Sequence, residues 1–112
     1  MKDIKSIADY LGWGTYFDSN ERITFSQYSP AGEDFSFTVD IEDVNNLEQI
    51  TKQVKEYADG FDVNEHAEMW LPQRGKGGCP DSLKGLLEDA ESIQEMLNEF
   101  ANFMYLEKYK LI

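Results

Sequence analysis

The sequence predicts an α+β fold in which a β-hairpin or small antiparallel sheet packs against helices. Two observations predict this class: apolar residues alternate with polar ones over residues 22–28 and 35–41, and they recur at intervals of three and four in later segments. The first period is that of a half-buried strand and the second that of an amphipathic helix. The chain has 112 residues, which suits one domain of ordinary size and is too short for two. We therefore expect a single domain over residues 1–112.

The N-terminal segment predicts a short helix over residues 3–11. Asp3 is a suitable N-cap residue and Gly12 a suitable stop. The apolar positions between them have helical spacing: Ile4, Ile7, Ala8 and Leu11. Residues 12–17 combine glycines with aromatic side chains, so they fit either a loop or a first short strand.

The two alternating segments predict an antiparallel hairpin. Ile23 and Phe25 alternate with polar residues in the first segment. The second segment has apolar residues at every other position: Phe35, Phe37, Val39 and Ile41. Residues 29–34 between them include Pro30 and Gly32, which favour a turn.

A helix is expected over residues 45–60. Asn45 and Glu48 have the spacing of a capping box, and Gly60 is a candidate left-handed terminator. The apolar stripe of this helix consists of Leu47, Ile50, Val54, Tyr57 and Ala58.

Residues 62–71 predict a shorter helix. It begins at Asp62, with Glu65 three residues later, and ends at Pro72. A strand over residues 68–71 is the competing interpretation, because so short a pattern cannot separate the two. We expect Trp70 to pack under the helix that follows.

The last helix is expected from about residue 81 to residue 107, after a glycine-rich loop over residues 73–80. Its apolar residues recur at spacings of three and four: Leu83, Leu86, Leu87, Ala90, Ile93, Leu97, Phe100, Ala101 and Met104.

The composition limits the classes of function. The chain carries 22 acidic and 10 basic residues, a formal net charge of -12. This charge opposes direct contact with nucleic acid, which depends on Lys and Arg. Because 41% of the residues are hydrophobic and 13% aromatic, the chain can nevertheless bury a core.

The single cysteine excludes an intrachain disulfide and any multi-cysteine zinc site. No apolar run approaches the roughly 18 residues of a membrane span, and Met1-Lys2-Asp3 is not followed by a signal-peptide core. We expect a soluble cytoplasmic protein with no membrane partner.

The acidic side chains are the first candidate site. No basic residue occurs from 85 to 107, and in this stretch glutamates follow one another at intervals of three or four, with Asp89 beside them: Glu88, Glu91, Glu95 and Glu99. A four-residue step rises about 6 Å along a helix, comparable to two phosphates of a DNA strand at about 3.4 Å each. Residues 40–68 contribute a second acidic tract, with these partner-binding candidates: Asp59, Asp62, Glu65 and Glu68.

Two interpretations of this charge stay open. Acidic surfaces keep small proteins soluble. Like charges four residues apart on a helix repel each other, however, and natural helices usually intersperse lysines. A surface that leaves this repulsion uncompensated suits a basic partner.

The loop over residues 73–80 is a secondary candidate through Arg74 and Lys76. Backbone N–H groups of a glycine-rich loop and the start of a helix both favour anions. The loop lacks the Gly-Lys-Ser/Thr of a Walker A motif. A structural connector is the alternative, in which the two cations pair with acids of the same chain.

Catalysis is not expected. Cys79 and His66 are the one thiol–imidazole couple available, but the sequence neither brings them together nor supplies an oxyanion-hole motif. Asp62, Glu65 and His66 could share a helix face as ligands, yet they match no zinc signature and capping explains the two acids. We therefore expect no catalytic residue, no metal and no cofactor.

Aromatic residues near the N-terminus are expected mainly in the core: Tyr10, Trp13, Tyr16 and Phe17. Any of them that is exposed becomes a candidate interface anchor.

A resemblance to a known family rests on several groups of residues. They are Asp34-Phe35-Ser36-Phe37, Tyr57 with Phe61-Asp62, Glu65-His66-Ala67-Glu68-Met69-Trp70-Leu71, Gly78 with Pro80, and Leu86-Leu87-Glu88-Asp89-Ala90-Glu91 with Leu97. With these residues, the stretch 35–106 resembles short, acidic, uncharacterised proteins of bacteriophages and other mobile elements of gut-type bacteria. Such elements commonly carry anti-CRISPR proteins, many of which are also small and acidic. The resemblance implies an anti-defence role in the cytoplasm of a bacterial host.

We therefore predict a non-enzymatic binding protein whose carboxylates occupy the basic nucleic-acid-binding channel of a partner protein, such as a CRISPR effector nuclease. Whether the chain acts as a monomer or a dimer stays open. The alternative is an accessory protein-interaction domain of a mobile element that acts on a host complex without DNA mimicry, through Arg74, Lys76 and exposed aromatic residues.

Overall fold

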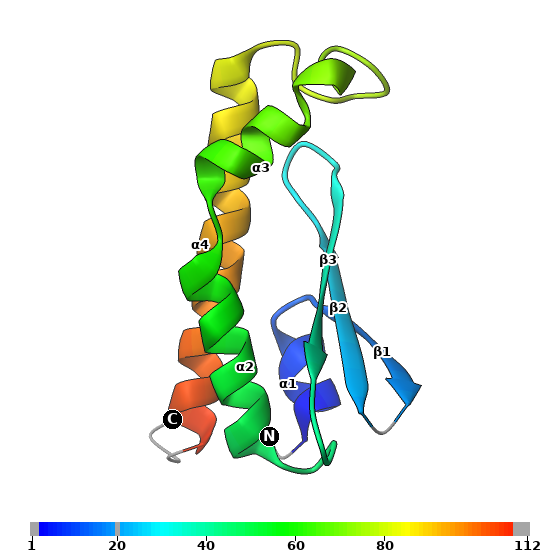
Figure 1. Cartoon of the computed structure of the whole chain (residues 1–112), viewed down its shortest axis with the longest axis vertical. Coiled ribbons are helices and arrows are strands. Elements are labelled where there is room, and N and C mark those ends of the chain that lie inside the picture. The colour runs from blue at the N-terminus through cyan, green and yellow to red at the C-terminus, as the bar shows by residue number, and fades with distance from the viewer. Residues whose placement is uncertain (1–2, 20, 109–112) are drawn as a thin grey trace.

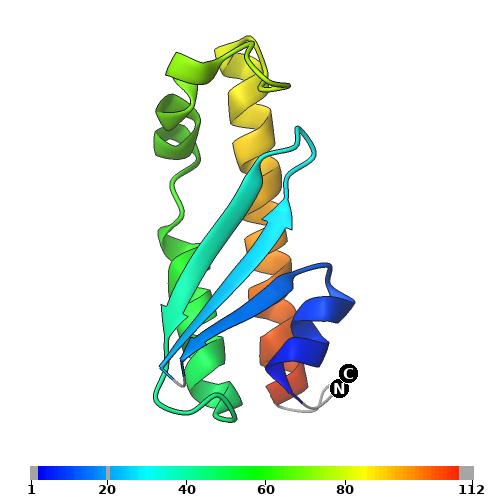
Figure 2. The ribbon, with the colours of Figure 1, turned by 90° about the vertical axis from the view of Figure 1, so that its right-hand side faces the viewer.

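The computed structural model of the chain describes residues 3–19 and 21–108 and has two layers (Figure 1). One layer is a three-stranded antiparallel sheet in the order β1-β2-β3, and helices α2 and α4 lie side by side against it (Figure 2). The elements are α1 Ile4–Tyr10, β1 Gly14–Ser19, β2 Arg22–Tyr28, β3 Asp34–Asp40, α2 Leu47–Gly60, α3 Val63–Met69, the 3-10 helix η1 Leu71–Gln73, and α4 Leu83–Lys108. The predicted α+β class, with its small antiparallel sheet and long C-terminal helix, is confirmed.

Helices α1 and α3 begin at the predicted N-caps. The Asp3 carboxylate accepts a hydrogen bond from Ser6 N–H (2.8 Å), and the Asp62 carboxylate accepts one from Glu65 N–H (3.1 Å). Each cap satisfies a backbone donor that has no partner within its helix. After α1, Gly12 adopts a φ of 88°, which favours glycine because a Cβ would be strained there.

Helix α2 ends at Gly60, the last residue of the predicted range, but its N-cap and the conformation of Gly60 differ from the prediction. Its N-cap is Asn46 rather than Asn45, because the Asn46 side chain accepts the hydrogen bond from Gln49 N–H (3.1 Å). Gly60 is the last helical residue and is not left-handed, so its predicted role as a terminator was wrong. The chain instead leaves α2 in an extended conformation at Phe61 (φ -69°, ψ 124°).

The sheet confirms the hairpin and decides one open alternative. β2 and β3 pair with Phe25 opposite Phe37 and Ile23 opposite Val39. Residues 14–19 form a strand rather than a loop, since β1 pairs antiparallel with β2. All three strands therefore contribute to one layer, with the apolar residues of β2 and β3 on its buried face.

Aromatic rings fill the space between this face and the helices. Trp13 is 2% exposed and stacks on Phe100 of α4 with ring centroids 5.4 Å apart. Phe25 meets Phe100 edge-on at 5.0 Å, and Phe37 meets Trp13 edge-on at 5.5 Å. Each such buried ring contributes about 1.5–3 kcal/mol, so this cluster fixes α4 against the sheet.

A second, smaller apolar cluster lies at the end of the molecule where α4 begins. It joins Ala67 of α3 to Leu86 and Ala90 of α4, with Trp70 packed against it. Residues 63–69 are thus helical, which rejects the competing strand, and Trp70 packs on the terminal helix as predicted. Pro72 lies in η1, beyond the end of α3.

None of the helices in the part of the chain that the structure describes combines the length and the apolar character of a membrane span.

Candidate functional site

The predicted glutamates of α4 lie on the helix face opposite the core. At 3.6 residues per turn, Glu88, Glu91, Glu95 and Glu99 fall within about 80° of one another and span about 16 Å along the axis. All four are exposed. The buried residues of α4 lie on the other side: Leu86, Ala90, Ile93, Leu97, Phe100, Ala101 and Met104.

A surface depression between α4 and the α2–α3 junction joins two parts of the predicted surface. Asp59 and Asp62 line it on one side, and Glu91 and Glu95 line it on the other. These residues are far apart in the sequence and converge because α2 and α3 both pack against α4. We define the acidic face as these four residues together with Glu88 and Glu99.

Two members of the acidic face have a basic neighbour. Lys55 Nζ lies 3.1 Å from the Asp59 carboxylate, and Lys84 Nζ lies 3.9 Å from that of Glu88. The prediction that the whole row is uncompensated is therefore wrong at Glu88. Both pairs are exposed, and such pairs contribute about 0–1 kcal/mol.

The other glutamates of the row keep their charge uncompensated. Glu91, Glu95 and Glu99 form no ion pair with any residue in the ranges 3–19 and 21–108. The Asp62 carboxylate caps α3 and has no basic partner within these ranges either. The acidic face is therefore a coherent anionic surface on rigid elements.

Glu65 and Glu68 do not belong to the acidic face. Both are exposed on α3. Glu65 lines a separate groove together with Tyr57 and Met69, and Asp62 borders both depressions. Glu68 lines neither depression, so the predicted partner-binding residues do not form one continuous surface.

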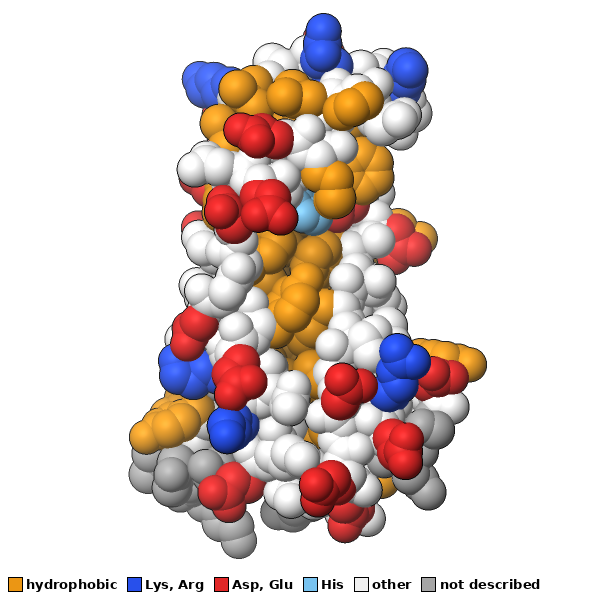
Figure 3. All heavy atoms as spheres, viewed as in Figure 1, with side chains coloured by type: hydrophobic (Ala, Val, Ile, Leu, Met, Phe, Trp, Pro, Cys, Tyr) orange, Lys and Arg blue, Asp and Glu red, His pale blue; other side chains and the backbone are white. Residues whose placement is uncertain are grey.

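That separate groove lies between α2, α3 and the edge of the sheet, where Figure 3 shows apolar side chains (orange) in a hollow beneath His66 (pale blue). We call it the aromatic groove and define it by Tyr57, Phe61 and Met69, with Glu56, Asp62 and Glu65 at its rim.

The Tyr57 ring stacks on Phe37 of β3 with centroids 4.5 Å apart. Burial, with a smaller effect from the negative charge of Glu33, raises the pKa of Tyr57 above 10.0. The groove therefore presents a neutral phenol at physiological pH.

Arg74 and Lys76 lie at the end of the molecule where α4 begins, where Figure 3 shows blue side chains. Neither forms an ion pair within the described ranges, so they do not neutralise acids in that part of the chain. At the start of α4, Ser82 Oγ accepts a hydrogen bond from Gly85 N–H (3.1 Å). The loop's three glycines have positive φ: Gly75, Gly77 and Gly78.

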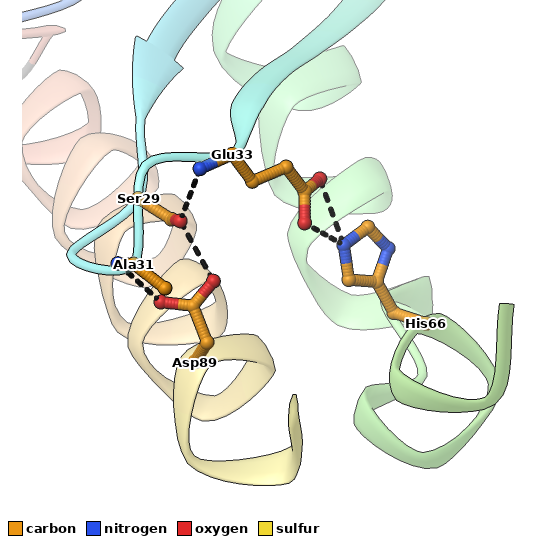
Figure 4. Close-up of polar contacts among 5 residues, drawn as sticks. All are labelled: Ser29, Ala31, Glu33, His66 and Asp89. Carbon is orange, nitrogen blue, oxygen red and sulfur yellow. Dashed lines mark hydrogen bonds and ion pairs between the residues drawn. The ribbon is translucent and has the colours of Figure 1, made fainter. Parts of the chain in front are cut away.

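A polar cluster at the tip of the β2–β3 hairpin was not predicted (Figure 4). The Asp89 carboxylate accepts hydrogen bonds from Ser29 Oγ (2.7 Å) and Ala31 N–H (2.9 Å), and Ser29 Oγ accepts one from Glu33 N–H (3.0 Å). The two Glu33 oxygens lie 2.9 and 3.0 Å from His66 Nε2. With side chains only 14% and 12% exposed, Glu33 and His66 tie the hairpin to α3, while Asp89 ties it to α4. We call these five residues the tip cluster.

One part of the tip cluster had a signal in the sequence. Asp89 follows Glu88 by one residue, which rotates it by about 100° around α4 and places it beside the buried stripe. Helical geometry therefore separates Asp89 from the glutamates next to it. Ser29 and Glu33 lie in a loop without periodicity, so no comparable signal identifies them.

The geometry does not assemble a nucleophilic or metal centre from the predicted candidates. His66 contacts Glu33, and no hydrogen bond joins it to Cys79 in the described part of the chain. Cys79 packs against the smaller apolar cluster. Among the described residues, no group of three or more His, Cys, Asp or Glu side chains could hold a metal ion.

Comparisons of the chain with protein-family models, with curated proteins and with solved structures found no match.

Proposed function

We propose that this chain is a non-enzymatic inhibitor whose acidic face occupies the basic nucleic-acid-binding channel of an effector nuclease, as an anti-CRISPR protein of a mobile element would. One observation carries the proposal: Glu91, Glu95 and Glu99 have no basic partner in the described ranges, and the first two face Asp59 and Asp62 across one depression.

The dimensions and rigidity of the acidic face suit this role. Its row on α4 is about 16 Å long, the length of roughly five phosphates along one DNA strand at about 3.4 Å each. The row lies on a helix that Phe100 and Trp13 hold against the sheet. The backbone beneath these carboxylates is already ordered when a row of Lys and Arg binds, so only their side chains lose conformational freedom on binding.

The repulsion within the acidic face also supports a basic partner. Like charges four residues apart, such as Glu91 and Glu95, destabilise a helix by a few tenths of a kcal/mol per pair, on the order of 0.2–0.5. A cationic channel removes this repulsion on binding, and complementary potentials accelerate association.

The direct test is a cleavage assay with a purified CRISPR effector nuclease and its target DNA. We expect excess protein to reduce cleavage, and to reduce it less when the nuclease is loaded with target DNA beforehand, because both ligands need the same channel. Unchanged cleavage across effectors of several types contradicts the proposal.

A second candidate function is an accessory interaction domain that binds a host complex without mimicking DNA. The observation that favours it is the exposure of Arg74 and Lys76 together with Tyr10 (67% exposed) and Tyr16 (65% exposed). Apolar and aromatic contacts are not screened by salt, whereas contacts between exposed charges are. Binding that persists at high salt would favour this second function.

A further inference from the structure

β3 is an edge strand with one unpaired side. The sheet order places β2 on its other side, and Ile41 N–H donates to Glu21 O at 2.7 Å just beyond the strand. Bonded pairs alternate along an antiparallel ladder, so this bond identifies the odd-numbered residues of β3 as those bonded to β2. The backbone N–H and C=O groups of Ser36 and Thr38 consequently point towards the free edge.

The middle of this edge lacks the usual protection against strand pairing. Natural edge strands are commonly shielded by lysines, prolines or bulges. β3 contains none of these, and its pairing with β2 is regular from Asp34 to Asp40. The exposed residues in the middle are the small Ser36 and Thr38, while charged side chains occur only at the two ends.

The aromatic groove lies beside the same edge. The Tyr57 ring stacks directly on Phe37 of β3, and Met69 is 61% exposed. A strand added to β3 would lie about 4.8 Å from it, with alternate side chains pointing into the layer between sheet and helices. Those side chains would contact Tyr57, Phe61 and Met69.

The rim of the groove determines the charge of a matching segment. Glu56, Asp62 and Glu65 border the groove, and none of them forms an ion pair within residues 3–19 and 21–108. Lys and Arg have aliphatic stems that cover apolar surface while their charged ends reach carboxylates. Their cations also bind favourably over an aromatic ring such as that of Tyr57.

We propose that an extended basic segment of the target protein adds to β3 as a fourth strand, with apolar and long cationic side chains in the aromatic groove. The inference rests on the proposed function for the existence of a basic protein target, and it assigns that target a second contact outside the acidic face. Main-chain hydrogen bonds supply affinity in such strand addition, and the groove supplies specificity.

The test uses the full chain and a short synthetic peptide in which every second residue is threonine and the residues between are valine and lysine in turn, so that one face carries both types of side chain. Binding is followed by NMR of the protein amides. We expect the peptide to shift the amide signals of Ser36 and Thr38 and to slow their hydrogen exchange. The matched control is the same peptide N-methylated at the amides that would face β3. It keeps every side chain and charge, and we expect it to bind about tenfold or more weakly, as loss of main-chain hydrogen bonds requires.

A variant tests the same contact from the protein side. Ser36→Pro removes an edge N–H that does not pair with β2, a position where sheets tolerate proline. We expect it to weaken peptide binding about tenfold, whereas Ser36→Ala, which keeps the N–H, should change binding by less than about twofold. The N-methylated peptide gives an answer with the unaltered protein even where Ser36→Pro does not fold.

Equal binding of the two peptides would overturn the inference, as would amide shifts confined to α4 or an absence of binding at millimolar peptide. The experiment contains no nuclease, so its failure leaves the cleavage assay as an independent test of the proposed function. Conversely, charge reversal at Glu91 and Glu95 should weaken inhibition about tenfold while leaving the peptide-induced shifts at Ser36 and Thr38 in place.

Discussion

The tip cluster and the acidic face draw carboxylates from the same helix and use them in opposite ways. Asp89 accepts hydrogen bonds from Ser29 and Ala31 of the hairpin. Glu91, two residues later, is exposed and has no basic partner in the described ranges. The angle around α4 makes the difference, because Asp89 borders the buried stripe and Glu91 lies away from it. The helix face, rather than membership of an acidic row, therefore decides what a carboxylate does.

Removing each carboxylate in turn should have very different effects on stability. We expect Asp89→Ala to lower the free energy of unfolding by about 2–3 kcal/mol, because Ser29 Oγ and Ala31 N–H lose a charged acceptor. Glu91→Ala should change it by no more than about 0.5 kcal/mol. Urea unfolding of the two variants measures both values, and equal effects would show that the tip cluster does not hold the hairpin.

The complementary change reverses charge on the acidic face. Glu91→Lys combined with Glu95→Lys should slow association with the target nuclease about tenfold and flatten its salt dependence, because steering depends on complementary charge. Stopped-flow or surface-based kinetics at several salt concentrations measure this.

The matched control for that change is Glu42→Lys combined with Asp81→Lys. It alters the net charge equally at exposed positions outside the acidic face. If both double variants slow association equally, net charge rather than the acidic face determines the rate.

Low exposure distinguishes the Glu33–His66 contact of the tip cluster from the ion pairs at the surface. A double-mutant cycle with Glu33→Gln and His66→Gln should give a coupling energy of about 1 kcal/mol, within the range for contacting residues. The same cycle on the exposed pair Lys55–Asp59 should give no more than about 0.5 kcal/mol. Equal coupling energies would mean that the low exposure of Glu33 and His66, 14% and 12%, does not strengthen their contact.

Periodicity explains why most of the fold could be predicted. Alternation identified β2 and β3, and spacings of three and four identified α4, since these patterns record which face is buried. The ends of α2 were harder to predict. Asn45 and Asn46 are chemically identical neighbours, and only the backbone geometry selects Asn46. Gly60 failed as a left-handed terminator because the chain leaves α2 extended at Phe61.

The candidate surfaces were predictable only where one helix supplies them. Spacing alone placed Glu91 and Glu95 on one face of α4. The position of Asp59 opposite them results from the packing of α2 on α4, which no local pattern records. The contact between Glu33 and His66 likewise joins a loop to a helix far along the chain. Tertiary packing therefore determines the parts of the site that sequence patterns miss.

The Asp3 carboxylate combines a property of each group: it is exposed, as that of Glu91 is, and it accepts a hydrogen bond, as that of Asp89 does. The hydrogen bond from Ser6 N–H holds the pKa of its carboxyl below the ordinary value of 3.8. The stabilisation from this cap is therefore complete above the unfolded-state pKa and is lost as the pH falls through the lower pKa of the folded state.

Asp3→Asn keeps an N-cap side chain and removes its titration. We expect its melting temperature to fall slightly less than that of the unaltered protein when the pH is lowered below 3.8, the smallest effect among these variants. Calorimetry across that range measures the difference, and Glu91→Gln serves as the control because its exposed carboxylate makes no such bond. If Asp3→Asn and the unaltered protein lost stability equally at low pH, the exposed cap would not favour an ionised carboxylate. A hydrogen bond alone would then not distinguish Asp89 from the acidic face, and the lower exposure of Asp89 would also be needed.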